Sequence, residues 1–595
     1  MREGSCGCLF HSREARWGKV TIDPHAHSLT RSVRPPVSQR QGGPSKASPR
    51  DVAASLQALL ARRIPLPLSS WPLAVLVAAF LLPGLVGHDP WKTEDAVGFG
   101  VVHQMLASGD WLAPSLAGEP YYEDGPLYFW VAALFVKLLG AVLPPHDAAR
   151  FASALFVLAA LACVRLAARE LYGKREGDLS TLAMLGSVGL LWHSHEAAAE
   201  TAMLAGLAAA YYGVAISHRK PYKGGLFFGL GSGVAFLAKG LVALVQPFAA
   251  ALLVLPISAP FRQPRFAIAV GLGLVILTPF LVVWPVLLAG RVPGYLEGWL
   301  AWQLANISNM PTWEKLLDVL KTLAWVAWPV WPLALWASWA YRRSLREPGF
   351  AVPFVAGLVS FVLLLFMREP RDMDALAMLV PLSIPAGAAV MALQRGAANA
   401  LGWFAIMTFS IAGSILWLLW LATLSGFPPS LAHTAARLEP GFVLEVRWLP
   451  LLVACLLTAA WWVLVLRAER STLRSVTLWA AGMTVVWALA VTIWLGWIDY
   501  AKSYRSVGES LRKALPADVR CVESRGLGIS QRAALHYHAG LVTRRVEAHG
   551  WSDCPYLLVQ IDTRAPAAEP EPPWKLVWEG RRPRDRERYR LYRRG

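Results

Sequence analysis

The sequence is poor in charged residues. Asp, Glu, Lys and Arg together make up 16% of its 595 residues, whereas soluble proteins average about 25%. Hydrophobic residues account for 55% of the chain, which also contains 28 Trp. This composition excludes both a single soluble globular domain and a disordered chain.

Cysteine is also scarce, and the common catalytic motifs are missing. Six cysteines are too few for a disulfide framework. Cys521 and Cys554 lie in the C-terminal region, where either a disulfide or two buried thiols fits the sequence. The sequence has no P-loop, dinucleotide-binding glycine motif, HExxH or nucleophile elbow in a usable context. It therefore gives no support to the enzyme classes that depend on these motifs.

Long apolar runs are abundant. Many are roughly 17 to 25 residues long, the length that crosses a bilayer, and basic clusters flank them as in the cytoplasmic loops of membrane proteins. The fold class is therefore an α-helical multi-spanning membrane protein. If every basic cluster faces the cytoplasm, thirteen transmembrane helices are expected, at residues 69–87, 150–168, 178–195, 199–217, 224–238, 241–260, 266–290, 315–341, 350–367, 374–393, 397–424, 448–466 and 475–497.

The distribution of charge predicts the domain organisation. Lys and Arg outnumber Asp and Glu by 57 to 39, an excess that in a membrane protein sets topology and does not indicate nucleic-acid binding. We expect a disordered basic cytoplasmic tail at residues 1–65 and a transmembrane domain at 66–499. The helix and strand pattern of residues 500–595 predicts a small soluble α/β domain on the outer side.

Residues 88–149 form a long outer loop after the first span. The apolar stretch at 126–143 would break the parity of the spans, so we expect a juxtamembrane or re-entrant helix there. Connections of this length are usually functional.

This loop contains acidic and aromatic residues close together. Glu94 and Asp95 are adjacent, and a carboxylate in a partly desolvated cleft has the raised pKa that suits a general base. Alternatively, both acids are first-turn residues of a helix over 96–108 that Thr93 caps. Tyr122 and its aromatic neighbours fit either carbohydrate binding or a membrane interface.

Cationic residues near other outer span ends are candidate phosphate ligands. Lys239 separates two apolar runs, so it either lines a polar cavity or extends to the interface. Arg368 and Arg371 breach the positive-inside pattern and can clamp a lipid phosphate, although short charged loops are often only solvated. Glu200 opens a span, where an acid complements the helix dipole.

Several segments resemble the GT-C membrane glycosyltransferases, in particular the lipid A aminoarabinose transferases and the wider protein O-mannosyltransferase family. The likeness is sharpest in the first outer loop and at Lys239-Gly240, which matches a Lys-Gly element of the family. The loop segments are residues 108–114 (SGDWLAP), 118–123 (GEPYYE) and 126–130 (PLYFW).

The resemblance implies an inverting transfer of a sugar from a polyprenyl phosphate to a lipid, glycan or protein acceptor, such as lipid A. It places the reaction at the periplasmic face of a bacterial inner membrane, without a soluble cofactor. The family's catalytic Asp-Glu pair aligns with Glu94 and Asp95 in reverse order. Glu123 matches a substrate-loop Glu of the family, and Glu200 stands where relatives often have an Asp. In a transferase of this kind we expect Glu123, Tyr122 and Glu200 to bind substrate, and Lys239 with Arg368 or Arg371 to hold the donor phosphate.

The sequence departs from the family pattern at other positions. Asp124 replaces a phosphate-contacting Lys, and Gln303-Leu304 replaces an acid-His pair, so no metal site is expected. Two alternatives to the transferase remain. One is a non-catalytic relative that binds a polyprenyl lipid, and the other is a lipid or solute transporter, which would be expected to show an internal repeat and broken helices.

Overall fold

The structure, a computed structural model, describes residues 63–595 except 69, 520, 563–572 and 584. The tail predicted at residues 1–65 lies outside the described residues except for its last three positions. All helices and strands below belong to one unit, Ala61–Gly595.

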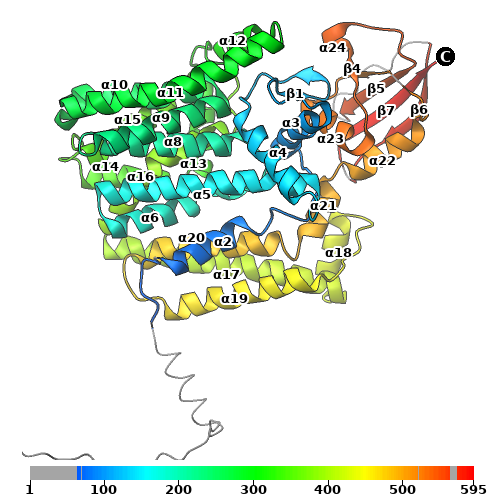
Figure 1. Ribbon diagram of the computed structural model, residues 1–595. Coiled ribbons are helices and arrows are strands. Elements are labelled where there is room, and N and C mark those ends of the chain that lie inside the picture. The colour runs from blue at the N-terminus through cyan, green and yellow to red at the C-terminus, as the bar shows by residue number, and fades with distance from the viewer. Residues whose placement is uncertain (1–62, 69, 520, 563–572, 584) are drawn as a thin grey trace, which may run out of the picture. The chain divides into compact units, whose positions relative to one another are not determined.

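The first half of the described chain is a series of apolar helices with one short antiparallel hairpin, β1–β2, in the first loop (Figure 1). Its elements are α2 (Trp71–Leu81), α3 (Glu94–Ser108), β1 (Ser115–Leu116), β2 (Glu119–Pro120), α4 (Leu127–Leu139), α5 (Pro145–Leu171), α6 (Lys174–Leu185), α7 (Val188–His193), α8 (Ala199–Ser217), α9 (Pro221–Lys239), α10 (Leu241–Ile257), η1 (Ala259–Arg262), α11 (Pro264–Arg291) and α12 (Tyr295–Asn306).

The second half continues with helices and ends in a sheet. Its elements are α13 (Trp313–Val326), α14 (Val330–Ala340), α15 (Pro348–Phe366), η2 (Asp374–Met378), α16 (Leu379–Met391), α17 (Arg395–Ser425), α18 (Pro429–Leu438), α19 (Trp448–Arg467), α20 (Arg474–Ala490), α21 (Leu495–Lys502), α22 (Arg505–Ala514), β3 (Val522–Arg525), α23 (Ile529–Ala539), β4 (Arg544–Arg545), α24 (Val546–His549), β5 (Tyr556–Asp562), β6 (Trp574–Gly580) and β7 (Glu587–Arg594).

Seven helices in the described residues are long and apolar enough to cross a membrane, or up to nine if each of two bent helix pairs is one span. The bent pairs are α13 with α14, at 97°, and α20 with α21, at 66°. Each of the thirteen predicted segments contains a helix, but the count of thirteen crossings stays a prediction. The stretch predicted as a juxtamembrane or re-entrant helix forms α4, whose 13 residues are fewer than a straight span needs.

Small residues let α8 and α9 pack with their backbones nearly touching. A Cβ added at Gly213 would lie 2.3 Å from the backbone nitrogen of Phe228, and one at Gly231 would lie 2.3 Å from that of Ala210. Close approach through glycine is a common way for membrane helices to associate. Because α8 begins with Glu200 in its first turn and α9 ends at Lys239, this packing brings the two charges to the same end of the helix pair.

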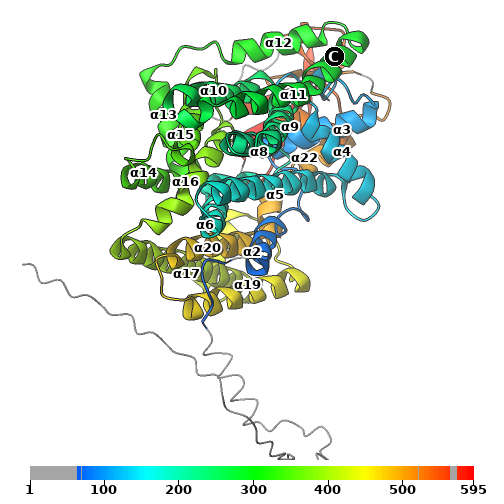
Figure 2. The ribbon, with the colours of Figure 1, turned by 60° about the vertical axis from the view of Figure 1, so that its left-hand side comes forward.

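Two groups of helices lie one above the other in the views of Figures 1 and 2. The first group contains α8, α9, α10, α11 and α15, and the second contains α2, α17, α19 and α20. Between them, α5 packs on both α8 and α6, and α6 in turn contacts α20. The first loop and the C-terminal sheet lie together beside these helices (Figure 1).

The C-terminal residues form a five-stranded mixed sheet in the order β4-β3-β5-β7-β6. Strands β3 and β5 are parallel neighbours, and a disulfide joins Cys521 to Cys554 just before them. Of the two states that the sequence allows for these cysteines, the structure has the disulfide. That this region is a separate periplasmic domain stays a prediction.

The C-terminal region docks on the first loop through ion pairs. Arg532 and Arg545 both contact Glu119, at 3.1 and 2.8 Å. Lys92 contacts Glu587 at 2.5 Å, and a Cβ on Gly100 of α3 would meet the side chain of Ala533 on α23. These contacts join the first loop, including α3, to α23, β4 and β7.

Candidate active site

The two adjacent acids at the start of α3 have different partners. Glu94 and Asp95 occupy its first turn, as the helix-dipole alternative expects, but the Thr93 side chain makes no capping hydrogen bond. Successive residues of a helix point about 100° apart. One acid therefore meets α5 and the other meets the loop before η2.

Asp95 is buried and fully engaged. The guanidinium of Arg150, on α5, contacts its two carboxylate oxygens at 2.6 and 3.1 Å. The backbone N–H groups of Trp91 and Ala197 also donate to this carboxylate, at 3.1 and 2.8 Å. Burial raises the pKa of Asp95, but Arg150 outweighs it and holds that pKa below the ordinary value. Asp95 is thus an ionised anchor for α3.

Glu94 lies on the other side of the helix turn, against Arg371. The guanidinium of Arg371 lies 3.2 Å from the Glu94 carboxylate and 2.9 Å from that of Glu123. Burial is the largest influence on Glu94 and raises its pKa to about 7, although Arg371 acts in the opposite direction. A carboxylate of this kind can accept a proton near neutral pH.

Lys239 is the centre of a second charge cluster. Its ammonium lies 2.6 Å from Asp124 and 2.8 Å from Glu200, and all three residues are buried. Burial raises the pKa of Asp124 to about 6 against the pull of Lys239. Arg371 connects the two clusters, because it also lies 3.8 Å from Glu200.

A tight approach of the first loop to the C-terminal end of α9 places Asp124 against Lys239. The N–H of Gly125 donates to the carbonyl oxygen of Ala238 at 2.9 Å, and a Cβ at position 125 would lie 2.2 Å from the carbonyl oxygen of Leu237. Because glycine has no Cβ, Gly125 allows the loop to meet the end of α9.

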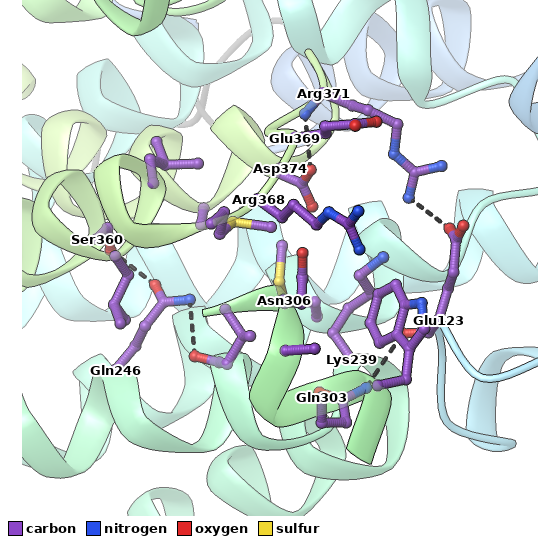
Figure 3. A pocket seen from close by; sticks show the side chains of 18 residues that line it. Glu123, Lys239, Gln246, Gln303, Asn306, Ser360, Arg368, Glu369, Arg371 and Asp374 are labelled. Carbon is purple, nitrogen blue, oxygen red and sulfur yellow. Dashed lines mark hydrogen bonds and ion pairs between the residues drawn. The ribbon is translucent and has the colours of Figure 1, made fainter. Parts of the chain in front are cut away.

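A groove of about 280 Å³ opens beside these clusters. Figure 3 shows it from close by, with Arg368 reaching into it and Arg371 joined to Glu123. One part is charged and another is apolar, as an amphiphilic ligand requires. Its charged lining is Glu123, Lys239, Arg368, Glu369, Arg371 and Asp374, and its apolar lining includes Met203, Val242, Leu363, Leu364 and Met367.

Arg368 differs from the other cations of the groove. Lys239 and Arg371 are ion-paired, whereas within the described residues no carboxylate lies in ion-pair distance of the Arg368 guanidinium. Its backbone N–H donates to the carbonyl of Asn306 on α12, at 2.7 Å, which fixes the start of its loop. Arg368 is thus the groove cation whose charge is available to a ligand.

The structure brings together six of the eight predicted site residues and places a seventh, Asp95, in a separate cluster. Glu94, Glu123, Glu200, Lys239 and Arg371 form one chain of ion pairs, which Arg368 adjoins in the groove, while Asp95 starts the separate Arg150 cluster. Tyr122 does not line the groove, because its ring packs on that of Tyr295 at a centroid distance of 5.0 Å.

Four residues of the site were not among the predicted ones, and Asp124, the partner of Lys239, is the first. Arg150 is fully buried and also contacts Asp147 at 2.9 Å, and a charged residue opening an apolar run was the signal for it. Asp374 accepts from the backbone N–H of Arg371 at 2.8 Å. Gln303 accepts from the N–H of Leu241 at 3.2 Å and donates to the Glu123 carbonyl at 3.3 Å. Local sequence patterns predict neither the Asp374 contact nor the Gln303 contacts.

Fold and groove together define a multi-pass membrane protein with an amphiphilic groove that meets buried acid–base clusters at one end of its helices. In the residues described, no group of three or more His, Cys, Asp or Glu is placed to hold a metal ion.

Comparisons with known proteins agree with this class. Residues 123–284 match the family model described as dolichyl-phosphate-mannose-protein mannosyltransferase. The undecaprenyl phosphate-alpha-4-amino-4-deoxy-L-arabinose arabinosyl transferase of Edwardsiella ictaluri is 30% identical over 196 residues, which are 30% of this chain and 33% of that protein. Sodalis glossinidius has a transferase of the same name with the suffix 1. It is 29% identical over 33% of this chain and 35% of its own length. The matches thus span about a third of the length of these relatives.

The fold has a solved counterpart. The crystal structure of ArnT from Cupriavidus metallidurans, bound to undecaprenyl phosphate, superposes with a TM-score of 0.61 at 18% identity and covers 91% of this chain and 98% of its own. The chain therefore has an ArnT-like GT-C fold and resembles the lipid A aminoarabinose transferases, as its first loop predicts.

Proposed function

We propose that the protein is a membrane glycosyltransferase that moves a sugar from a polyprenyl-phosphate donor to a lipid, glycan or protein acceptor. Its relatives carry the name of such transferases, and the similar solved structure is described as bound to undecaprenyl phosphate. One observation carries the proposal: Glu94, whose pKa burial raises to about 7, lies 3.2 Å from Arg371, which lines the groove.

The reaction is a single displacement at the anomeric carbon. The acceptor hydroxyl or amine attacks that carbon and passes its proton to Glu94, while the bond from the carbon to the phosphate oxygen breaks and polyprenyl phosphate leaves. Arg368 binds the phosphate, because its charge is the one available in the groove, and Lys239 and Arg371 add positive potential. No nucleotide or soluble cofactor takes part.

The other predicted site residues have supporting roles. Glu123 and Glu200 hold Arg371 beside Glu94 and so orient the base. Asp95 positions α3 through Arg150 and does not itself accept the proton. Tyr122 supports α12, which forms one wall of the groove, through Tyr295.

The proposal includes a topology. Thirteen helices cross a bacterial inner membrane between residues 66 and 499, the N-terminus is cytoplasmic, and residues 500–595 form a periplasmic α/β domain. The docking of Glu119 with Arg532 at 3.1 Å supports placing the C-terminal sheet on the same side as the first loop.

A transfer assay with defined donors tests the function. The purified protein is reconstituted in liposomes with a panel of polyprenyl-phosphate sugars and a crude envelope acceptor, and released polyprenyl phosphate is measured by mass spectrometry. We expect release from one donor class only. If every donor binds and none is consumed, the protein is the non-catalytic lipid-binding relative. Mass spectrometry of envelope lipids and glycans from a deletion strain then identifies the sugar.

Replacing Arg368 by glutamine should weaken binding of polyprenyl phosphate about tenfold, because a hydrogen bond to a charged group contributes about 1.5–3 kcal/mol. Binding is measured by native mass spectrometry or microscale thermophoresis. The matched control is Arg291→Gln, an exposed arginine at the end of α11, which should bind as the unaltered protein does. Equal losses in the two variants would assign the effect to net charge rather than to the groove.

A further inference from the structure

A second polar cavity lies at the end of the helices away from the active site. Helix α16 starts at Leu379, directly after η2 and Asp374 of the groove, and its 13 residues carry the chain about 20 Å away at 1.5 Å per residue. Helix α17 begins there with Arg395, and α20, which packs on α17, begins with Arg474. Two helix N-termini therefore meet at this end, and each carries a partial positive charge.

The cavity between α17 and α20 has a volume of about 730 Å³ and is lined by positive and neutral polar groups. Arg395, Arg470 and Arg474 contribute three guanidiniums, and no carboxylate is among its lining residues. The other lining residues are Ala398, Asn399, Gly402, Trp403, Ile406, Ser471, Thr472 and Ser475. Hydroxyl, amide and guanidinium donors around a concave space are the chemistry that phosphate oxygens require.

Several polar groups that line this cavity have no hydrogen-bond or ion-pair partner among the described residues. In the described part of the chain, no carboxylate pairs with Arg395, Arg470 or Arg474. The Nε of Arg474 and the hydroxyl of Ser471 are buried and make no hydrogen bond to the described residues. The Nη2 of Arg474 donates to the carbonyl of Val465 at 2.6 Å, which fixes this guanidinium in place. Three like charges held together, with donors unused, favour an anionic ligand.

The ligand must also be amphiphilic, because an exposed apolar face of α17 runs away from the cavity. Trp403 lines the cavity and is 65% exposed, and Met407 and Ile411 follow at intervals of four residues with 54% and 51% exposure. Residues four apart lie on one face of a helix. This stripe offers a surface for acyl chains next to the arginines.

We propose that this cavity binds the phosphate headgroup of an anionic membrane phospholipid, with its acyl chains lying along Trp403, Met407 and Ile411 of α17. Basic pockets between transmembrane helices bind such headgroups by the same physics. The site does not use the catalytic groove, and it holds whether or not the chain transfers a sugar.

Lipid binding to the delipidated, detergent-purified full chain tests the site by native mass spectrometry. We expect phosphatidylglycerol to bind at least about tenfold more tightly than phosphatidylcholine, and the triple variant Arg395→Gln, Arg470→Gln, Arg474→Gln to lose that preference, since each cation near a lipid phosphate contributes measurably. The matched control is Arg342→Gln, Arg343→Gln, Arg346→Gln, which removes the same charge from the loop after α14 and should keep the preference.

Two results would overturn the proposal. One is a triple variant that retains the full preference for phosphatidylglycerol. The other is displacement of bound phosphatidylglycerol by inorganic phosphate at the concentration at which added phosphatidylglycerol displaces it. That result would make the cavity a free-phosphate site. If the triple variant does not fold, Arg470→Gln decides the matter, because that side chain is exposed: an unchanged preference in it contradicts the site, and a loss of about threefold supports it.

Discussion

Replacing Glu94 by glutamine should reduce the turnover number about 100- to 10,000-fold, the range that general-base catalysis supplies, while polyprenyl phosphate binds within about threefold of normal. Glutamine has nearly the same shape as glutamate but cannot accept the acceptor's proton. Glu94→Asp should retain part of the activity, because the base survives with a shorter reach. Turnover and donor binding are measured separately on the same reconstituted samples.

The pH dependence of the same reaction gives an independent check. Burial raises the pKa of Glu94 to about 7, and the base acts in its ionised form. Only about a tenth of it is ionised one pH unit below that pKa, so the turnover number should rise roughly tenfold between pH 6 and pH 8 and then level off. Arg371→Gln removes the nearest positive charge and should move this rise to higher pH.

The control for both experiments is Glu297→Gln, an exposed acid on α12 outside the groove. It should leave turnover and its pH profile unchanged. A Glu94→Gln protein with normal turnover would exclude Glu94 as the base. In that case Asp95→Asn, with its expected effect on folding measured separately, becomes the next variant to test.

Replacing Arg150 by methionine should destabilise the protein strongly. Arg150 is fully buried and contacts both Asp95 and Asp147, so its removal leaves two carboxylates buried without their cation. Breaking such a buried pair costs about 3–5 kcal/mol. We expect a large fall in the apparent melting temperature and in the yield of folded protein, measured by fluorescence-detected thermal unfolding.

The matched control is Lys220→Gln. Its ion pair with Glu170, at 2.7 Å, is half exposed and should contribute no more than about 1 kcal/mol. Similar losses in the two variants would show that the Arg150 cluster is no more important than a surface pair. Recovery of stability in Arg150→Met combined with Asp95→Asn and Asp147→Asn would show that unpaired charge, and not lost packing, causes the instability.

Much of the fold can be read from local patterns. Apolar runs of bilayer length predict the helices, and each of the thirteen predicted segments contains one. The start of α3 and the helix and strand order after Arg505 are also visible in local patterning. Such features depend on residues close together in the chain, where periodicity and turn signals act. Whether a helix crosses the membrane depends also on its neighbours, so the number of crossings is not fixed by these patterns.

By itself, the amino-acid sequence determined that this is a helical membrane protein, that the first loop and Lys239 resemble those of GT-C transferases, and that Glu94 and Asp95 are candidate bases. Only the tertiary structure decided which cation each acid contacts. Arg150 lies 55 residues from Asp95 in the chain, and Arg371 lies 277 residues from Glu94. Likewise, only folding pairs Lys239 with Asp124 and leaves Arg368 as the groove cation that no carboxylate of the described residues pairs. Hydrophobicity is a property of short segments, whereas burial, ion pairing and the pKa of an acid depend on residues that only long-range packing brings together.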